Sequence, residues 1–253
     1  SRALHGDEAA RIEGGYVGVL ERILASAEKR APALLRLSTL VTEIRWSAGR
    51  VLVESRKSTG LPLPRLQARA AVVCVPLGVL RAPAGATGAI RFAPRLHDVE
   101  RAAGAMVQGP LFKLLLRFRE PFWRSGTPTA HRARLRGLGF AHLPGGAVPT
   151  WWTTEPVESG VLTGWAGGPL AQELSTLPPD ARRGRALDSL QRLFGVPRAV
   201  IEAQLEDEAL HDWEADPYAR GGYAVTEVGG LGAARVLAQP VAEIVESAGA
   251  LRR

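Results

Sequence analysis

The sequence has very little cysteine, few lysines and no long apolar run. Cys74 is the only cysteine among 253 residues, which excludes an internal disulfide framework and cysteine-based zinc sites. No apolar run approaches the roughly 18 residues needed to cross a bilayer, so no membrane-spanning helix is expected. The five histidines show no metal-ligand spacing, and neither H-E-x-x-H nor G-x-S-x-G occurs. Metalloenzyme and serine-hydrolase readings therefore have no support.

The charge is basic but evenly distributed. The net charge is +7 and the pI is about 10.4, and only three of the 32 basic residues are lysines. The arginines are spread along the chain, often beside Ala and Gly, which is typical of a GC-rich genome rather than of a binding stripe. A basic balance alone indicates solubility and non-specific attraction, so specific nucleic-acid binding is not expected.

What is present is the composition of a folded protein. Apolar residues make up 46% and charged residues 23% of the chain, which excludes a disordered tail protein. The length fits one large domain or two small ones. Cys74, within Val-Val-Cys-Val-Pro, is interpreted as a small buried apolar residue.

Hydrophobic periodicity predicts a mixed α/β fold. Residues 16–29 have apolar positions at helical spacing, and 36–76 predict a three-strand meander whose last strand ends at Pro76. Further on, 111–118 predict a strong strand, followed by shorter strands. Residues 169–176 and 180–194 predict helices, the second with Gly195 just past its end.

Lys113 is the most informative residue. It lies in Leu111-Phe112-Lys113-Leu114-Leu115-Leu116-Arg117-Phe118, where both faces of a strand carry apolar residues, which predicts a strand covered on both sides. An ammonium group there is costly unless it is paired or reaches water. Near a cleft it suits a proton relay or a water-holding group. The alternative is an edge-strand lysine whose tip reaches solvent.

Three aromatic residues gather in the segment 213–223, WEADPYARGGY. Pro217 and Gly221-Gly222 predict a loop, and aromatic side chains on a loop can stack on a flat ligand or surround a cation. Packing of the core beneath the loop is the alternative. The glycine pattern at 230–235 imitates a dinucleotide fingerprint, but it lacks the third glycine and is rejected.

Taken together, several segments resemble the flavin-containing amine oxidases, which include polyamine oxidases, monoamine oxidases and lysine-specific histone demethylases. The segments occur in family order. They are GGY at 14–16, LSTLVTEIRW at 37–46, VVCVPLGVL at 72–80, IRFAPRL at 90–96, the block from Gly109 to Trp123, WEADPYARGGY at 213–223 and LAQPV at 237–241.

The resemblance implies a role for five residues. Lys113 matches the lysine that holds a water near flavin N5, and the backbone of Val41 matches the adenine contact. Trp213 and Tyr218 match aromatic residues that line the flavin, and Tyr223 matches one wall of the cage that receives the amine. The implied reaction moves a hydride from the carbon beside an amine nitrogen to FAD. The imine is then hydrolysed, and O2 reoxidises the flavin to give H2O2.

The sequence departs from the family at both ends. The G-x-G-x-x-G unit that binds the FAD pyrophosphate is absent, and Ala250 stands where the family has Glu. The chain alone is therefore expected to bind FAD weakly or not at all. A fragment, a truncated gene and one part of a split enzyme all remain open, the last with a partner chain that carries the nucleotide-binding unit.

The resemblance also implies an organisation. Residues 1–76 and 213–253 are expected to be remnants of the FAD-binding domain, and 77–212 the substrate-binding domain with a mostly antiparallel sheet and flanking helices. Because no leader is visible, a bacterial cytoplasmic location is expected. Polyamine, monoamine and amino-acid substrates stay open. A flavoprotein with desaturase chemistry is disfavoured, because such proteins are expected to lack a lysine at the position of Lys113.

Overall fold

The computed structural model describes residue 12 and residues 15–30, 35–125 and 137–242. The chain forms two compact units, Ser1–Thr39 and Leu40–Arg253. This division falls at a different place from the expected domain boundaries at 76 and 212, which stay a prediction. Across the described residues, no helix is long and apolar enough to cross a membrane.

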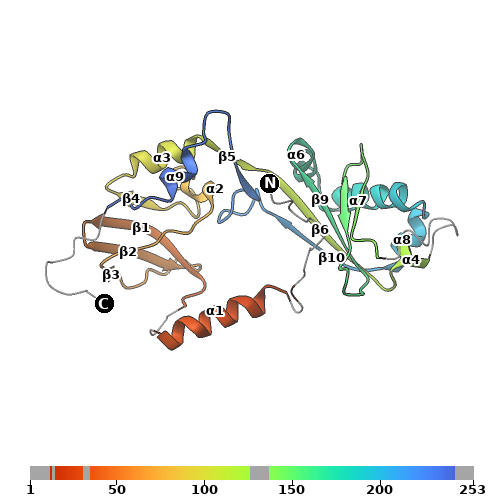
Figure 1. The fold of residues 1–253 in the computed structure, drawn as a ribbon, viewed down its shortest axis with the longest axis horizontal. Coiled ribbons are helices and arrows are strands. Elements are labelled where there is room, and N and C mark those ends of the chain that lie inside the picture. The colour runs from red at the N-terminus through yellow and green to blue at the C-terminus, as the bar shows by residue number, and fades with distance from the viewer. Residues whose placement is uncertain (1–11, 13–14, 31–34, 126–136, 243–253) are drawn as a thin grey trace, which may run out of the picture. The chain divides into compact units, whose positions relative to one another are not determined.

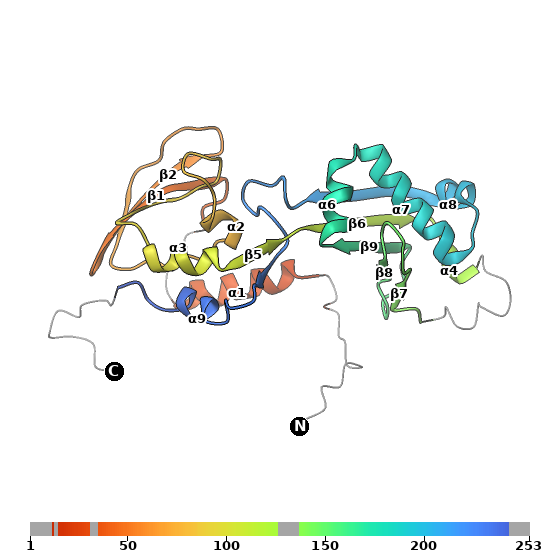
Figure 2. The same ribbon diagram turned by 90° about the horizontal axis from the view of Figure 1, so that it is seen from above.

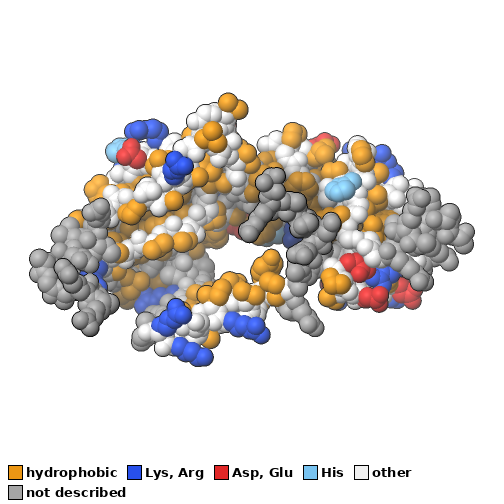
Figure 3. All heavy atoms as spheres, in the orientation of Figure 1, with side chains coloured by type: hydrophobic (Ala, Val, Ile, Leu, Met, Phe, Trp, Pro, Cys, Tyr) orange, Lys and Arg blue, Asp and Glu red, His pale blue; other side chains and the backbone are white. Residues whose placement is uncertain are grey.

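The first unit contains helix α1, Val17–Arg30, close to the predicted range. Hydrophobic side chains line one side of the helix, with Lys and Arg along the other (Figure 3). None of its residues is buried, and Tyr16, Leu20 and Ile23 are largely exposed. The apolar stripe that predicts the helix therefore lies uncovered.

The second unit begins with a four-stranded sheet in the order β3-β2-β1-β4. Its strands are β1 (Thr39–Ser47), β2 (Arg50–Lys57), β3 (Leu66–Ala68) and β4 (Arg91–Ala93). The first two form the predicted hairpin, and β4 adds to β1 in parallel, with Glu43 opposite Arg91. The predicted meander thus gains a fourth strand from a loop-rich segment.

The third strand of the meander was predicted too long. It ends at Ala68, and residues 69–76 have no strand structure. Cys74 is exposed rather than buried, and Val72 is almost fully exposed. Within the described chain no strand pairs with this segment, so its apolar side chains have nothing to pack against.

Short elements surround a small second core. They are α2 (Leu77–Leu80), α3 (His97–Gly104), α9 (Ala233–Leu237) and the two-stranded ladder of β5 (Met106–Gly109) with β11 (Tyr223–Thr226). Their shared core consists of Leu77, Ala102, Ala103, Met106 and Ala233. The ladder pairs β11 with β5, although more than 100 residues separate them in sequence.

The largest core lies between a five-stranded antiparallel sheet and helices (Figures 1 and 2). The sheet has the order β10-β6-β9-β8-β7. Its strands are β6 (Leu111–Phe118), β7 (Phe140–His142), β8 (Thr150–Trp152), β9 (Val161–Gly167) and β10 (Leu205–Asp212). The helices are α4 (Phe122–Ser125), α6 (Pro169–Thr176), α7 (Pro179–Phe194) and α8 (Arg198–Gln204). Gly195 follows α7 in the left-handed conformation, as predicted.

Among the described residues, helices cover only one face of this sheet. On β6, Phe112, Leu114, Leu116 and Phe118 are buried in the helix-side core, whereas Leu115 and Arg117 on the other face are exposed. The expectation of a strand covered on both sides was wrong, because the leucines at 111 and 115 share their face with polar residues and face no helix. The fold class, mixed helices with mostly antiparallel sheets, is confirmed.

Candidate functional site

The site is a row of side chains across the uncovered face of the five-stranded sheet. Lys113 on β6 lies directly opposite Trp165 on β9 and His211 on β10. Residues opposite each other in an antiparallel ladder point to the same face, so Lys113 stands between the histidine and the tryptophan. Because β6 has a neighbour on each side, Lys113 does not lie on an edge strand.

Lys113 is half-buried in this row. Within the described parts of the chain, no carboxylate forms an ion pair with its ammonium group. A lysine held by an interior strand and lacking a carboxylate partner keeps its donors available for water or a ligand. This is the geometry that a water-holding lysine requires, and the role itself stays a prediction.

The row continues across β8 and β7. Thr150 is opposite Trp165, and His142 is opposite Thr150, with 3.3 Å between His142 Nδ1 and Thr150 Oγ1. One step along the strands, the rings of Phe140 and Trp152 are 5.9 Å apart. The uncovered face therefore carries aromatic surface beside its polar groups.

Tyr223 lies against two glycines beside the row. A Cβ on Gly109 would lie 2.6 Å from the Tyr223 ring, so the ring rests directly on this backbone. A Cβ on Gly167 would lie 2.8 Å from the Trp165 ring and 3.1 Å from the Tyr223 hydroxyl. The two aromatic side chains are thus neighbours, and only glycine at 109 and 167 leaves room for them.

The loop from Trp213 to Gly222 is held by its own hydrogen bonds. The Gly221 N–H donates to the Trp213 carbonyl at 2.6 Å, and Asp212 Oδ1 accepts from the N–H groups of Glu214 and Ala215. Asp216 Oδ1 accepts from the Tyr218 N–H at 2.8 Å. The two aspartates therefore fix where the aromatic residues of this loop lie.

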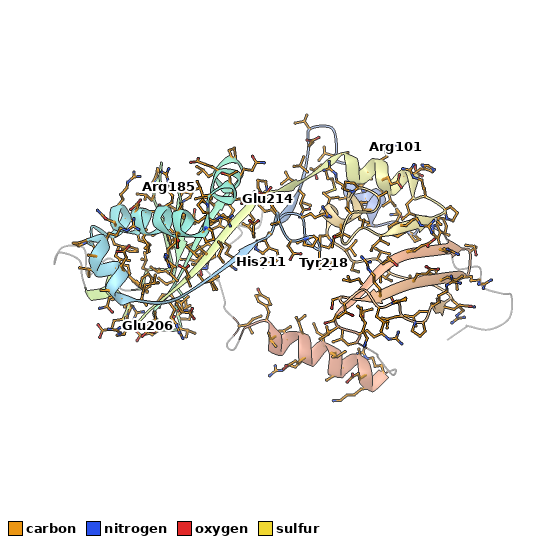
Figure 4. All side chains as sticks on the ribbon, turned by 180° about the vertical axis from the view of Figure 1, so that it is seen from behind. Arg101, Arg185, Glu206, His211, Glu214 and Tyr218 are labelled. Atoms are coloured by element: carbon orange, nitrogen blue, oxygen red, sulfur yellow. The ribbon has the colours of Figure 1, made fainter. Side chains whose placement is uncertain are left out.

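His211 connects the loop to the row. Its Nε2 lies 3.0 Å from Asp216 Oδ2, and its ring packs edge-on against Trp213 with 4.4 Å between centroids. Figure 4 shows His211 at the end of β10, with Glu214 and Tyr218 in the loop that follows. The predicted residues Lys113, Trp213 and Tyr223 thus lie near one end of the sheet, whereas a Cβ on Gly88 would lie 3.1 Å from the Tyr218 ring.

Val41 is the exception among the predicted site residues. It lies on β1, in the four-stranded sheet, and not in the row. Its predicted adenine contact involves a different part of the fold and stays a prediction.

The residues present fit an isoalloxazine ring. The indole N–H of Trp213 is buried and has no acceptor among the described residues, a condition that costs about 1–3 kcal/mol. A flavin offers carbonyl oxygens and ring nitrogens as acceptors, and the aromatic side chains of Trp213 and Tyr218 offer a flat apolar surface. No group of three or more His, Cys, Asp or Glu side chains suited to a metal ion occurs among the described residues.

Sequence reasoning missed Trp165 and His211. Each belongs to the site only through its register with Lys113, and strand register between segments about 50 and 100 residues apart leaves no local signal.

Comparison with known proteins agrees with this architecture. The family described as flavin containing amine oxidoreductase matches residues 2–246. A Drosophila melanogaster protein described as a possible lysine-specific histone demethylase 1 is 27% identical over 217 residues, which is 82% of this chain and 23% of that protein.

Solved structures of two oxidases share the fold. A putrescine oxidase with putrescine bound aligns at a TM-score of 0.63 and 20% identity, over 86% of this chain and 43% of that one. The cyclohexylamine oxidase from Brevibacterium oxydans IH-35A aligns at 0.62 and 20% identity, over 89% of this chain and 45% of that one. The chain spans under half the length of these oxidases and about a quarter of the demethylase relative. With the family match covering nearly all of the sequence, the chain belongs to the flavin containing amine oxidoreductases.

Proposed function

We propose that this chain provides the substrate-facing sheet of an FAD-dependent amine oxidase that acts on a primary or secondary amine. Bound FAD would supply the acceptor for a hydride from the carbon beside the amine nitrogen, and O2 would take up the electrons to give H2O2. The observation that carries the proposal is the row in which Lys113 stands between Trp165 and His211, with Tyr223 against Gly167.

The chain's own residues would bind and position the amine. The faces of the Tyr223 and Trp165 rings attract an ammonium group, while their apolar surface disfavours the charge and so promotes release of a proton. Lys113, whose ammonium donors have no carboxylate partner among the described residues, would hold water for hydrolysis of the imine and for reoxidation of the flavin.

We also infer that these 253 residues alone bind FAD weakly. No G-x-G-x-x-G occurs in them, so the backbone cradle that holds a pyrophosphate in dinucleotide-binding units is not provided. The remaining predicted contacts are the adenine contact of Val41 and the aromatic surfaces of Trp213 and Tyr218. Fluorescence titration of FAD with the chain measures this directly, and equimolar yellow flavin retained through purification would contradict it.

The oxidase proposal is tested by amine-dependent H2O2 formation at saturating FAD, with putrescine, benzylamine and an amino acid as substrates. Lys113→Met is expected to slow flavin reoxidation by about 10²-fold, because a positioned cation is lost beside the reacting ring. Arg117→Met is the matched control, since it removes a positive charge from the same face of β6. No peroxide with any amine, or equal losses in both variants, would refute the proposal.

A second function is a non-catalytic or split-enzyme module that pairs with a separate nucleotide-binding chain. The uncovered apolar side chains of α1 and of residues 72–73 favour it, because single-chain proteins rarely leave contiguous apolar surface exposed. Co-purification with a chain that carries G-x-G-x-x-G, lost on Leu20→Glu with Ile23→Glu, would support it. A partner retained by this double variant would argue against pairing through α1.

A further inference from the structure

His211 has a fixed orientation, and the proposed function assigns it no role. Its Nε2 is committed to Asp216 at 3.0 Å, and the same carboxylate is fixed through its other oxygen by the Tyr218 N–H. Trp213 packs against the ring edge-on. A histidine whose one nitrogen is anchored on a fixed carboxylate has its ring orientation set and its second nitrogen, Nδ1, left for another partner.

The His211 side chain belongs to the same row as Lys113. Adjacent strands are about 4.8 Å apart, so a ligand above Lys113 lies within reach of side chains from both β9 and β10. The charged groups that face the imidazole are Lys113 across the ladder and Asp216 in the loop, with Glu214 exposed beside it. On its other side β10 is the edge of the sheet, so no further strand of the described chain faces His211.

The amine chemistry requires a proton acceptor in this row. An alkylamine is an ammonium ion near neutral pH, and it must lose that charge before its α-hydrogen can leave as hydride. Lys113 is itself a donor when charged, so it cannot take the proton in that form. Imidazole is the side chain suited to accept protons near neutral pH.

We propose that His211 is the catalytic base that takes the proton from the bound ammonium ion, with Asp216 as its positioning residue. An N–H bond of the ammonium breaks, its electron pair stays on the amine nitrogen, and the proton forms a bond with Nδ1. The resulting imidazolium is paired with Asp216 and returns its proton to water. This inference rests on the proposed function.

The first test requires no turnover. The resonances of the His211 imidazole are followed by NMR while the chain is titrated with α,α-dimethylbenzylamine, an amine that has no α-hydrogen and cannot be oxidised. The titration is carried out at the lowest pH at which the NMR spectrum of the amine-free chain shows a neutral His211 imidazole. Binding is expected to convert His211 to imidazolium, and Asp216→Asn to abolish the conversion. His97, at the start of α3 and outside the row, is the internal control and stays unchanged.

The second test is the rate of flavin bleaching by excess amine under anaerobic conditions. Near neutral pH, the bleaching rate of His211→Gln is expected to be about 10²-fold lower than that of the wild type. This rate is expected to recover as the pH approaches the range in which the free amine is neutral. His97→Gln, the matched variant at the start of α3 and outside the row, leaves the rate unchanged.

The outcomes separate this inference from the proposed function. Amine binding without charging of His211, or bleaching by His211→Gln at the wild-type rate, overturns the inference and leaves the oxidase proposal standing. The absence of any amine binding and any bleaching overturns both. If His211→Gln proves unstable, the Asp216→Asn titration decides the question, because its loss of imidazolium formation is read from a resonance of the folded chain.

Discussion

In the four-stranded sheet, a buried glutamate is paired with two arginines. Glu43 is 5% exposed and is held by Arg45, with 2.8 Å from Nε to Oε1, and by Arg91, with 2.5 Å from Nη2 to Oε2. The hydrogen bond from Arg45 has the largest effect and lowers the pKa of Glu43. Burial opposes this shift in part, and Arg91 lowers the pKa further.

This lowered pKa makes stability depend on pH. A carboxyl group with a depressed pKa stabilises the fold above its ordinary pKa, and the contribution is lost as the pH falls through the lowered value. Glu43→Gln is therefore expected to lower the urea midpoint at pH 7, with the difference from wild type shrinking towards pH 3. Glu28→Gln on α1 is the control for loss of a charge. A difference that stays constant from pH 7 to pH 3 would contradict the assignment.

At the scale of the element, the two faces of β6 differ in burial. Leu116 is fully buried against the helices, whereas its neighbour Leu115 is 38% exposed on the row side. Leu116→Ala is expected to cost about 2–5 kcal/mol of unfolding free energy, because it leaves a cavity in a packed core. Leu115→Ala, the same change one residue away, is expected to cost under about 1 kcal/mol. Chemical denaturation measures both, and equal costs would mean that the two faces are packed alike.

The same elements show what the sequence could predict. Periodicity located α1, α6 and α7, and the block around Lys113 located β6, because these depend on local patterns. The sequence could not predict that β4 pairs with β1 in parallel or that β3 ends early. Both depend on which distant strand is available to pair. For the candidate site, motif resemblance predicted roles for Lys113, Trp213, Tyr218 and Tyr223, and these roles stay predictions. Trp165 and His211 required the ladder register itself.

At the scale of the whole molecule, the chain's two units differ in how much they bury. Helix α1 in the first unit contributes no buried residue, whereas both apolar cores lie in the second unit. A chain that begins at Thr39 is therefore expected to unfold within about 2 °C of the full chain's Tm, because removing exposed surface changes stability little. Calorimetry on both chains provides the measurement. A large drop in Tm for the shorter chain would show that α1 supports the second unit.

The single covered face of the five-stranded sheet has a consequence for evolution and engineering. Because the helices pack on Leu114, Leu116 and their neighbours alone, the residues of the opposite face can be exchanged without repacking the interior. Libraries that randomise Phe140, Trp152 and Thr150 should thus retain folded members in high proportion. The side chains on this face can therefore change during evolution while the packed core on the other face stays the same.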